Sequence, residues 1–518
     1  HSFDQDKPAL ISTDIFTGQA DGGDVFVEVD TMRLRGAGSC GGTCIPTGIL
    51  AQTGGEGSAG KITVHAGQMT VETGGTISTT TFSQGQSGDL VVDADNIILD
   101  GEDTGFATQS FTPFPANAGN VNINTNNLTL INGAQIRSQT GGPGRAGDIS
   151  IQAEKIFLSG GSLSGSSSIT SQQLALDDIG AGDAGDINVI TRHLEVRNGA
   201  NINALTVGEG QGGNMSVTAE NILLVGDPSI LFTGLSNETQ NDGNAGNLAV
   251  TAHTLEIRDN ARIEASTLFD QITGADQFSG QGGNITVTAH DISISGEGAG
   301  IVAKSTNRNP AATSGRIQVI ANDSIRLEDR GAISVETVLA DAGNIDIQVN
   351  ELLLLRNNSS ITTSVAGGEG RGGDIRIDPV FTILDRGSRI VAQAREGAGG
   401  NIRIVSDFFF ASPDSLVSAS SDLGIDGVVD IESPDTDVIS GALELPESFL
   451  DAASLLSDRC SARTAKGSSS FIVSGRGGVP PGPETMLPVY AFDLSAKADG
   501  GAGRPLGEVS LARNCAAH

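Results

Sequence analysis

Aromatic residues are scarce in this sequence of 518 residues, which has no tryptophan, one tyrosine (Tyr490) and 18 phenylalanines. Charged residues make up only 18%, whereas glycine occurs 71 times. A chain of this length would usually form several domains, but it lacks the large side chains around which several globular cores are built. Aliphatic residues and alanine recur along nearly the whole length. This pattern excludes disorder and favours one thin, extended core.

Basic residues are also few, with 30 Lys and Arg against 62 Asp and Glu, and the net charge is −32. The charge is uneven, because residues 459–518 contain seven basic and four acidic residues and so carry +3, which leaves −35 on residues 1–458. An acidic body of this size repels phosphate backbones, so we expect no nucleic-acid partner.

Long apolar runs are missing as well. No segment approaches the roughly 20 apolar residues that a membrane-spanning helix needs, and the run Phe408-Phe409-Phe410 is short and flanked by Asp407 and Asp414. We therefore expect a chain that does not span a membrane. No signal peptide is recognisable and the sequence opens at His1, so we interpret it as a processed or trimmed piece of an exported protein.

The four cysteines form two groups, Cys40 with Cys44 and Cys460 with Cys515. Four cysteines allow three pairings, and the simplest is one local disulfide plus one that closes a loop in the C-terminal region. Zinc binding is the rival interpretation, less favoured because no histidine or second close cysteine pair accompanies either group. Disulfides would indicate an oxidising, exported location.

A repeat led by glycine dominates the sequence. Fourteen anchor glycines recur at intervals of 27 to 38 residues, and Asn or Asp follows eleven of them. The anchors are Gly23, Gly60, Gly88, Gly119, Gly147, Gly185, Gly213, Gly246, Gly283, Gly315, Gly343, Gly373, Gly400 and Gly427.

The unit that begins at Gly246 shows the pattern inside one repeat. Apolar residues alternate with polar ones in three short runs, within residues 247–252, 255–257 and 261–265, and polar corners such as Asp259-Asn260 separate the runs. Alternation with period two over short runs predicts strands. Strands this short hide a core only when each unit forms one coil that stacks on the next, so that each strand pairs in parallel with its counterpart about 4.8 Å away.

The predicted fold is therefore all-β, a right-handed parallel β-helix of about 14 coils of three short strands over residues 1–440. The main alternative, a leucine-rich horseshoe, requires a helix or helical turn in every unit, and no run of helical period appears between Gly60 and Gly427. The pattern stops after Ile431. Residues 441–518 form a separate tail module, in which we expect a short helix at 446–458, a linker at 479–483 and a strand at 489–494. The basic tail would either cap the last coil or join neighbouring chains head to tail.

The repeated Gly-Asn-Ile-x-Val-x-Ala blocks, with Gly-Ala-x-Ile steps at residues 133–136 and 199–202, resemble the filamentous-haemagglutinin-like exoproteins of two-partner secretion, above all those of cyanobacteria and other environmental bacteria. The tail run at 468–481 is similar to the C-terminal ends of those proteins. The family's N-terminal secretion domain is absent from this sequence. The resemblance implies a β-helix exported through an outer-membrane partner and displayed on the cell surface or released. Some members of the family tether themselves through a C-terminal cysteine pair, which Cys460 and Cys515 match only loosely.

Parallel β-helices also include polysaccharide lyases and hydrolases, so an enzyme is the alternative function. The sequence has no Gly-His-Gly, Arg-Ile-Lys or Asn-Thr-Asp motif on a predicted strand, and the adjacent acidic pair Asp177-Asp178 falls in a loop. Four internal histidines follow their anchors by five to eight residues, and we interpret them as exposed corner residues rather than catalytic groups. They are His65, His193, His253 and His290.

The sequence also has few of the motifs and residues that bind metals or sugars. The Gly-Gly-x-Gly-x-Asp calcium motif is missing, and the segments 21–24 and 372–374 are interpreted as repeat anchors. Sugar stacking lacks its usual aromatic residues. We therefore expect no cofactor, no metal and no catalytic residue. The predicted function is a secreted or surface-displayed structural or adhesive rod, whose partners are the secretion pore, other copies of itself and a surface glycan or matrix.

Overall fold

The computed structural model describes residues 10–36, 47–162, 165–174, 182–229, 232–240, 242–268 and 280–433. The chain divides into two units, His1–Ala442 and Leu443–His518, and all of these residues belong to the first. They form strands and turns and no helix, and so they contain no helix that is long and apolar enough to cross a membrane. The predicted helix, linker and strand of the tail lie outside the described residues, as do Cys40, Cys44, Cys460 and Cys515.

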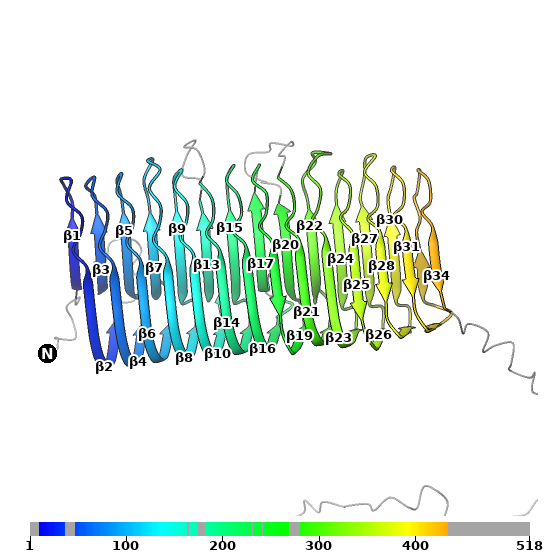
Figure 1. Cartoon of the computed structure of the whole chain (residues 1–518), viewed down its shortest axis with the longest axis horizontal. Coiled ribbons are helices and arrows are strands. Elements are labelled where there is room, and N and C mark those ends of the chain that lie inside the picture. The colour runs from blue at the N-terminus through cyan, green and yellow to red at the C-terminus, as the bar shows by residue number, and fades with distance from the viewer. Residues whose placement is uncertain are drawn as a thin grey trace, which may run out of the picture. The chain divides into compact units, whose positions relative to one another are not determined.

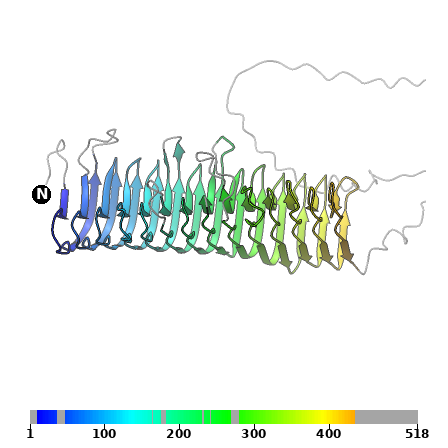
Figure 2. The same ribbon diagram turned by 90° about the horizontal axis from the view of Figure 1, so that it is seen from above.

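The first unit is a stack of coils that follow one another along a single axis from β1 to β34 (Figure 1, Figure 2). One sheet contains 14 strands, each paired in parallel with its counterpart in the next coil. Its strands are β1 (Leu10–Ile15), β3 (Thr47–Thr53), β5 (Gly75–Thr81), β7 (Gly105–Ser110), β9 (Gln135–Thr140), β13 (Ser168–Gln173), β15 (Asn201–Thr206), β17 (Thr233–Gln240), β20 (Ala261–Leu268), β22 (Gly300–Ser305), β24 (Ala332–Thr337), β27 (Ser360–Val365), β30 (Arg389–Gln393) and β33 (Leu416–Ser418).

A second parallel sheet is built from the other strand or strands of each coil. It contains β2 (Val25–Arg35), β4 (Ile62–Glu72), β6 (Leu90–Asp100), β8 (Val121–Ile131), β10 (Ile149–Ser159), β14 (Ile187–Arg197), β16 (Met215–Val225), β18 (Leu248–Thr251), β19 (Thr254–Arg258), β21 (Ile285–Ser295), β23 (Ile317–Glu328), β25 (Ile345–Val349), β26 (Leu352–Leu355), β28 (Ile375–Asp378), β29 (Phe381–Leu384), β31 (Ile402–Val405), β32 (Phe408–Ala411) and β34 (Val429–Glu432). A small antiparallel hairpin joins β11 (Gly161–Ser162) to β12 (Gly165–Ser166). The predicted parallel β-helix is thus confirmed, with a number of coils close to the expected one.

Aliphatic side chains fill the interior in columns that run from coil to coil. In the long strands, residues at every second position are buried and those between them face solvent, as in β8, where Val121 and Ile123 are buried and Asn122 and Asn124 are exposed. Parallel pairing in register places equivalent inward residues above one another, which makes one continuous core. One such column consists of Ile62, Leu90, Val121, Ile149, Ile187, Met215, Leu248, Ile285, Ile317, Ile345, Ile375 and Ile402, all at most 1% exposed.

The first two predicted runs of each unit are continuous strands in most coils. β8 runs through eleven residues without interruption and bends where two successive side chains, Asn126 and Asn127, both face outward. This repeated outward position shifts the alternation by one residue, so the inward positions resume at Leu128 on the next face. In the unit at Gly246 the two runs are separate strands, β18 and β19, as predicted.

Tight turns connect the second sheet to the first. The backbone has positive φ at two successive residues in several of them, including Asn132-Gly133, Asn198-Gly199 and Asp259-Asn260. Two left-handed central residues define a type I′ turn, in which Asn, Asp and Gly are favoured. The Asp259-Asn260 corner expected from the sequence is one of these turns.

The anchor glycines form a column in which successive backbones lie very close together. A Cβ atom built on Gly213 would lie 1.9 Å from the carbonyl oxygen of Gly185, and each of the thirteen anchors from Gly60 onward would meet the preceding anchor's oxygen at 1.8 to 2.1 Å. Only glycine fits such a contact. Hydroxyl side chains of the first sheet complete the hydrogen bonding here, as where Ser138 Oγ donates to the Gly119 carbonyl (3.1 Å) and accepts from the Gly147 N–H (2.7 Å).

The Asn or Asp that follows an anchor links one coil to the next. The side-chain oxygen of Asp148, for example, accepts a hydrogen bond from the backbone N–H of Asp186 at 2.8 Å. All eleven residues of this kind accept such a bond, at 2.7 to 3.1 Å. These bonds join residues about one repeat apart.

Candidate functional site

A shallow acidic groove crosses the first four coils of the second sheet. It has a volume of about 750 Å³ and lies along the bend of strands β2, β4, β6 and β8. We call it the acidic groove; its residues are Glu28, Val29, Asp30, His65, Ala66, Gly67, Asp93, Ala94, Asp95, Asn124, Thr125 and Asn126. Four of these residues are carboxylates and none is Lys or Arg, so the groove favours cationic groups and hydrogen-bond donors.

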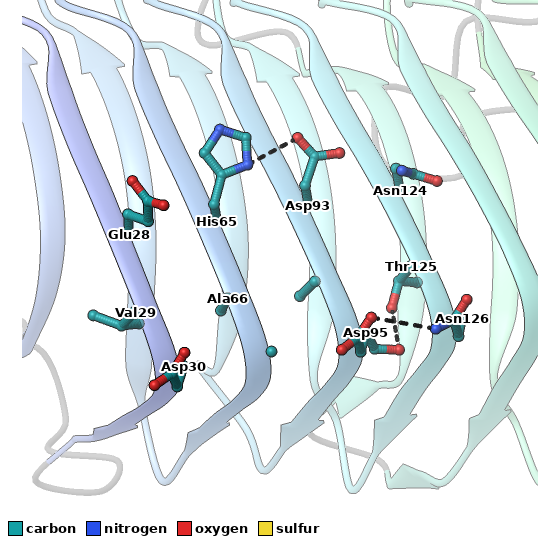
Figure 3. Close-up of a pocket in the computed structure, with 12 residues that line it drawn as sticks. Glu28, Val29, Asp30, His65, Ala66, Asp93, Asp95, Asn124, Thr125 and Asn126 are labelled. Atoms are coloured by element: carbon teal, nitrogen blue, oxygen red, sulfur yellow. Dashed lines mark hydrogen bonds and ion pairs between the residues drawn. The ribbon is translucent and has the colours of Figure 1, made fainter.

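Two rows of outward side chains define the groove (Figure 3). The first row places Glu28 beside His65, then Asp93 and then Asn124, each in register with the next. The second row, two residues further along each strand, consists of Asp30, Gly67, Asp95 and Asn126. Parallel pairing sets neighbours in a row about 4.8 Å apart.

The hydrogen bonds within the groove hold some of these groups and leave others available. His65 Nδ1 lies 3.2 Å from Asp93 Oδ2, and both side chains are about 40% exposed. Asn126 Nδ2 donates to Asp95 Oδ1 at 3.4 Å, and the Thr125 hydroxyl donates to the Asp95 carbonyl at 3.1 Å. The Phe26 ring packs against His65 with centroids 5.4 Å apart. These contacts hold His65 on β4 and Asp95 on β6, the two middle strands of the groove, while Glu28 and Asp30 lie on its first strand, β2.

Gly67 separates two carboxylates in the second row. Asp30 and Asp95 occupy the equivalent positions of strands β2 and β6, two coils apart, and Gly67 of β4 lies between them without a side chain. Two coil steps amount to about 9.6 Å. The gap therefore leaves room for a bound group with an acidic side chain on each side.

The four histidines occupy three different positions on the coils instead of one recurring corner. His65 lies on the outward face of β4, in the row of Asp93. His193 is the second of the two successive outward residues at the bend of β14 and is in register with Asn221, to which its Nδ1 is hydrogen-bonded at 3.2 Å. His253 and His290 share the corner itself, with ring centroids 4.7 Å apart. The sequence had assigned all of them to one kind of exposed turn.

Several other sequence interpretations can be placed on the structure. Asp21 and Asp24 accept backbone hydrogen bonds from Ser58 and Lys61 of the next coil, each at 2.8 Å, and Asp374 accepts one from Asn401 at 2.8 Å. These acids thus belong to the repeat. The pair at 177–178 lies outside the described residues.

The acidic groove itself was missed from the sequence, although a signal exists. Glu28, His65 and Asp93 each follow their anchor by five residues, and Asp30 and Asp95 follow theirs by seven. Alignment of the repeats on their anchor glycines would have placed all five in two adjacent columns.

No protein family, no curated protein and no solved structure matches this chain.

Proposed function

We propose that the protein is an extracellular rod with a structural or adhesive role, whose acidic groove is a binding surface for a glycan or matrix component. The observation that carries the proposal is the stacking of 14 strand levels in register over one continuous core. Such a solenoid is stabilised by contacts between neighbouring coils. It repeats its outward side chains at a fixed spacing, which suits an extended polymer ligand.

The chemistry of the groove indicates which polymer suits it. Carboxylate and amide oxygens accept hydrogen bonds from sugar hydroxyls and form stronger, charge-assisted bonds with ammonium groups. A uronic acid polymer would be repelled by the four carboxylates. Neutral and amino-substituted polysaccharides are therefore the proposed ligands.

Binding to immobilised polysaccharides tests this proposal. The doubly substituted variant Asp30→Asn/Glu28→Gln should lose affinity for an amino-substituted polysaccharide such as chitosan by about tenfold or more, because each charge-assisted bond contributes about 1.5–3 kcal/mol. Glu154→Gln is the matched control, since Glu154 lies in the column of Asp30 but pairs with Arg192 at 3.4 Å. Equal binding by the groove variant and the control would contradict the assignment of the groove.

A polysaccharide-cleaving enzyme is the second candidate, and the two acids on either side of Gly67 favour it. Inverting glycosidases separate their two carboxyl groups by about 6.5–9.5 Å, which is near the spacing of two coils. Reducing-end release from neutral and amino-substituted polysaccharides, abolished in both Asp30→Asn and Asp95→Asn, would establish this activity. Binding without release would support the adhesive role.

The resemblance to filamentous-haemagglutinin-like exoproteins supplies the proposed location, which is outside the cell after export through an outer-membrane partner. Fractionation of the native host should find the protein on the cell surface or in the medium. Electron microscopy of purified protein should show rods, for which thirteen coil steps give a length of about 62 Å. A protein retained inside the cell would contradict the proposed export.

A further inference from the structure

The corner shared by β19, β21 and β23 gathers groups that bind metals. The imidazole rings of His253 and His290 pack against each other with centroids 4.7 Å apart, one coil above the other. The backbone N–H of His290 donates to the carbonyl oxygen of His253 at 3.0 Å, which fixes the two residues in the same column. Asp291 follows directly, and its Oδ2 lies 2.9 Å from His290 Nδ1.

A β-bulge adds a third group to this corner. Strand β23 has twelve residues where β21 has eleven, and the register between them shifts between Ala289 and Asp291. Ala321 remains opposite Ala289 and Ser324 stands opposite Asp291, so Asn322 and Asp323 together face His290. The register shifts back one coil later, where Ile345 pairs with Ile375 but Leu352 pairs with Phe381. Bulges are common beside functional sites because they redirect a side chain.

The bulge places Asp323 next to His290 and Asp291. One potential ligand atom from each of the three residues lies within 4.8 Å of the other two, and all three side chains are partly exposed. An ion with bonds of about 2.1 Å holds its ligand atoms within about 4.2 Å of one another. Small side-chain rotations are therefore enough to bring the three atoms to an ion.

Two ionised carboxylates this close repel each other unless a proton or a metal or other positive charge lies between them. Arg326 gives only partial compensation, because its Nη1 is 3.8 Å from Asp291 Oδ1. Its stronger contact is with the Ser324 hydroxyl at 2.5 Å, and that hydroxyl in turn donates to Asp291 Oδ1 at 2.5 Å. This chain of bonds orients the Asp291 carboxylate toward His290, as outer groups do around metal ligands.

We infer that His290, Asp291 and Asp323 form a binding site for a divalent transition-metal ion of the Zn²⁺ or Mn²⁺ class. One imidazole and two carboxylates are a ligand set that suits these ions. Three protein ligands leave at least one coordination position for water or for an oxygen of a bound molecule. The site joins two coils at the bulge, so a bound ion also stabilises the corner. This inference does not depend on the proposed function.

Calorimetric titration of the full-length, chelator-treated protein with Zn²⁺ tests the inference. Wild type should bind one ion at this corner. The affinity for that ion should fall by about tenfold or more in Asp323→Asn and in His290→Gln. His193→Gln is the matched control, because it removes a histidine that is hydrogen-bonded to Asn221 and lies outside both the corner and the acidic groove. None of these substitutions alters a cysteine, so zinc binding by thiolates would be unchanged in all of them.

Circular dichroism and thermal melting without metal should show that each variant folds like wild type. Zn²⁺ should raise the melting temperature of wild type and of His193→Gln and leave that of Asp323→Asn unchanged. Absence of zinc binding by wild type, or equal binding by wild type and by both corner variants, would overturn the inference. Repetition of the titration with Mn²⁺ and Ca²⁺ determines which class of ion binds more tightly.

Discussion

The side-chain oxygen of Asn120 accepts a hydrogen bond from the backbone N–H of Asp148, in the next coil, at 2.8 Å. Asn120 itself donates its backbone N–H to Asp89 Oδ1 of the preceding coil, also at 2.8 Å. The Asn or Asp side chain after each anchor glycine thus extends the hydrogen bonding between coils to a corner that precedes the paired strand. Asn and Asp are the residues short enough to present an oxygen there.

Loss of one member of this ladder should weaken the coil locally. We expect Asn120→Ala to lower the free energy of unfolding by about 0.5–1.5 kcal/mol, because the Asp148 N–H loses its partner. Asn120→Asp keeps the oxygen and should remain close to wild type. Denaturant unfolding measures the difference, and hydrogen exchange at Asp148 locates it. Equal destabilisation by the alanine and aspartate variants would show that the acceptor oxygen is unimportant.

The glycine column provides a second test, with a control in the same column. A Cβ on Gly213 would lie 1.9 Å from the Gly185 oxygen, whereas one on Gly23 would meet only the Thr13 side chain, at 3.7 Å. Gly213→Ala should therefore destabilise the protein by about 1–3 kcal/mol or more through forced separation of two coils. Gly23→Ala should have little effect. The comparison is made by thermal and denaturant unfolding, and similar losses in both variants would argue against the close contact.

Strand β14 offers a matched pair of aliphatic residues on opposite faces. Leu194 is 1% exposed in the core, whereas Ile190 is 46% exposed on the outer face. Leu194→Ala should lower the free energy of unfolding by about 2–5 kcal/mol because it leaves a cavity. Ile190→Ala should change the free energy of unfolding by less than about 0.5 kcal/mol. Equal effects would mean that the strand faces are assigned incorrectly.

Glu238 on β17 should make stability depend on pH. Burial, and then the neighbouring carboxylate of Glu264, raise the pKa of Glu238, against smaller opposing effects of Ser236 and Arg262. A raised pKa in the folded chain means that the folded state binds this proton more tightly than the unfolded state. The contribution of Glu238 is therefore favourable in acid and is lost as the pH rises through the folded-state pKa.

The substitution Glu238→Gln should thus raise the melting temperature at neutral pH and give a smaller gain, or none, in acid. Glu256→Gln serves as a control, because it removes a partly exposed carboxylate that pairs with Arg258. Melting curves across the acidic and neutral range decide the matter. A gain that grows as the pH falls would have the wrong sign and would refute the role assigned to Glu238.

The acidic groove and the metal-binding corner show why sites were harder to predict than the fold. Glu28, His65 and Asp93 are separated by intervals of 37 and 28 residues, so they meet only because the longer interval contains an insertion outside the paired strands. Asp323 is harder still to find. Its repeat has the ordinary interval of 28 residues between Gly315 and Gly343, and the extra residue in β23 is offset elsewhere in the coil.

The sequence by itself determined the class of fold, the anchor positions and the inward faces. Each follows from local chemistry, since period-two alternation fixes which residues are buried and paired turn residues permit left-handed corners. Only the tertiary structure decided which outward residues became neighbours. That outcome depends on the register between coils, which is set by insertions, bends and bulges, and a single-residue change in register brings a different side chain to every position of a row.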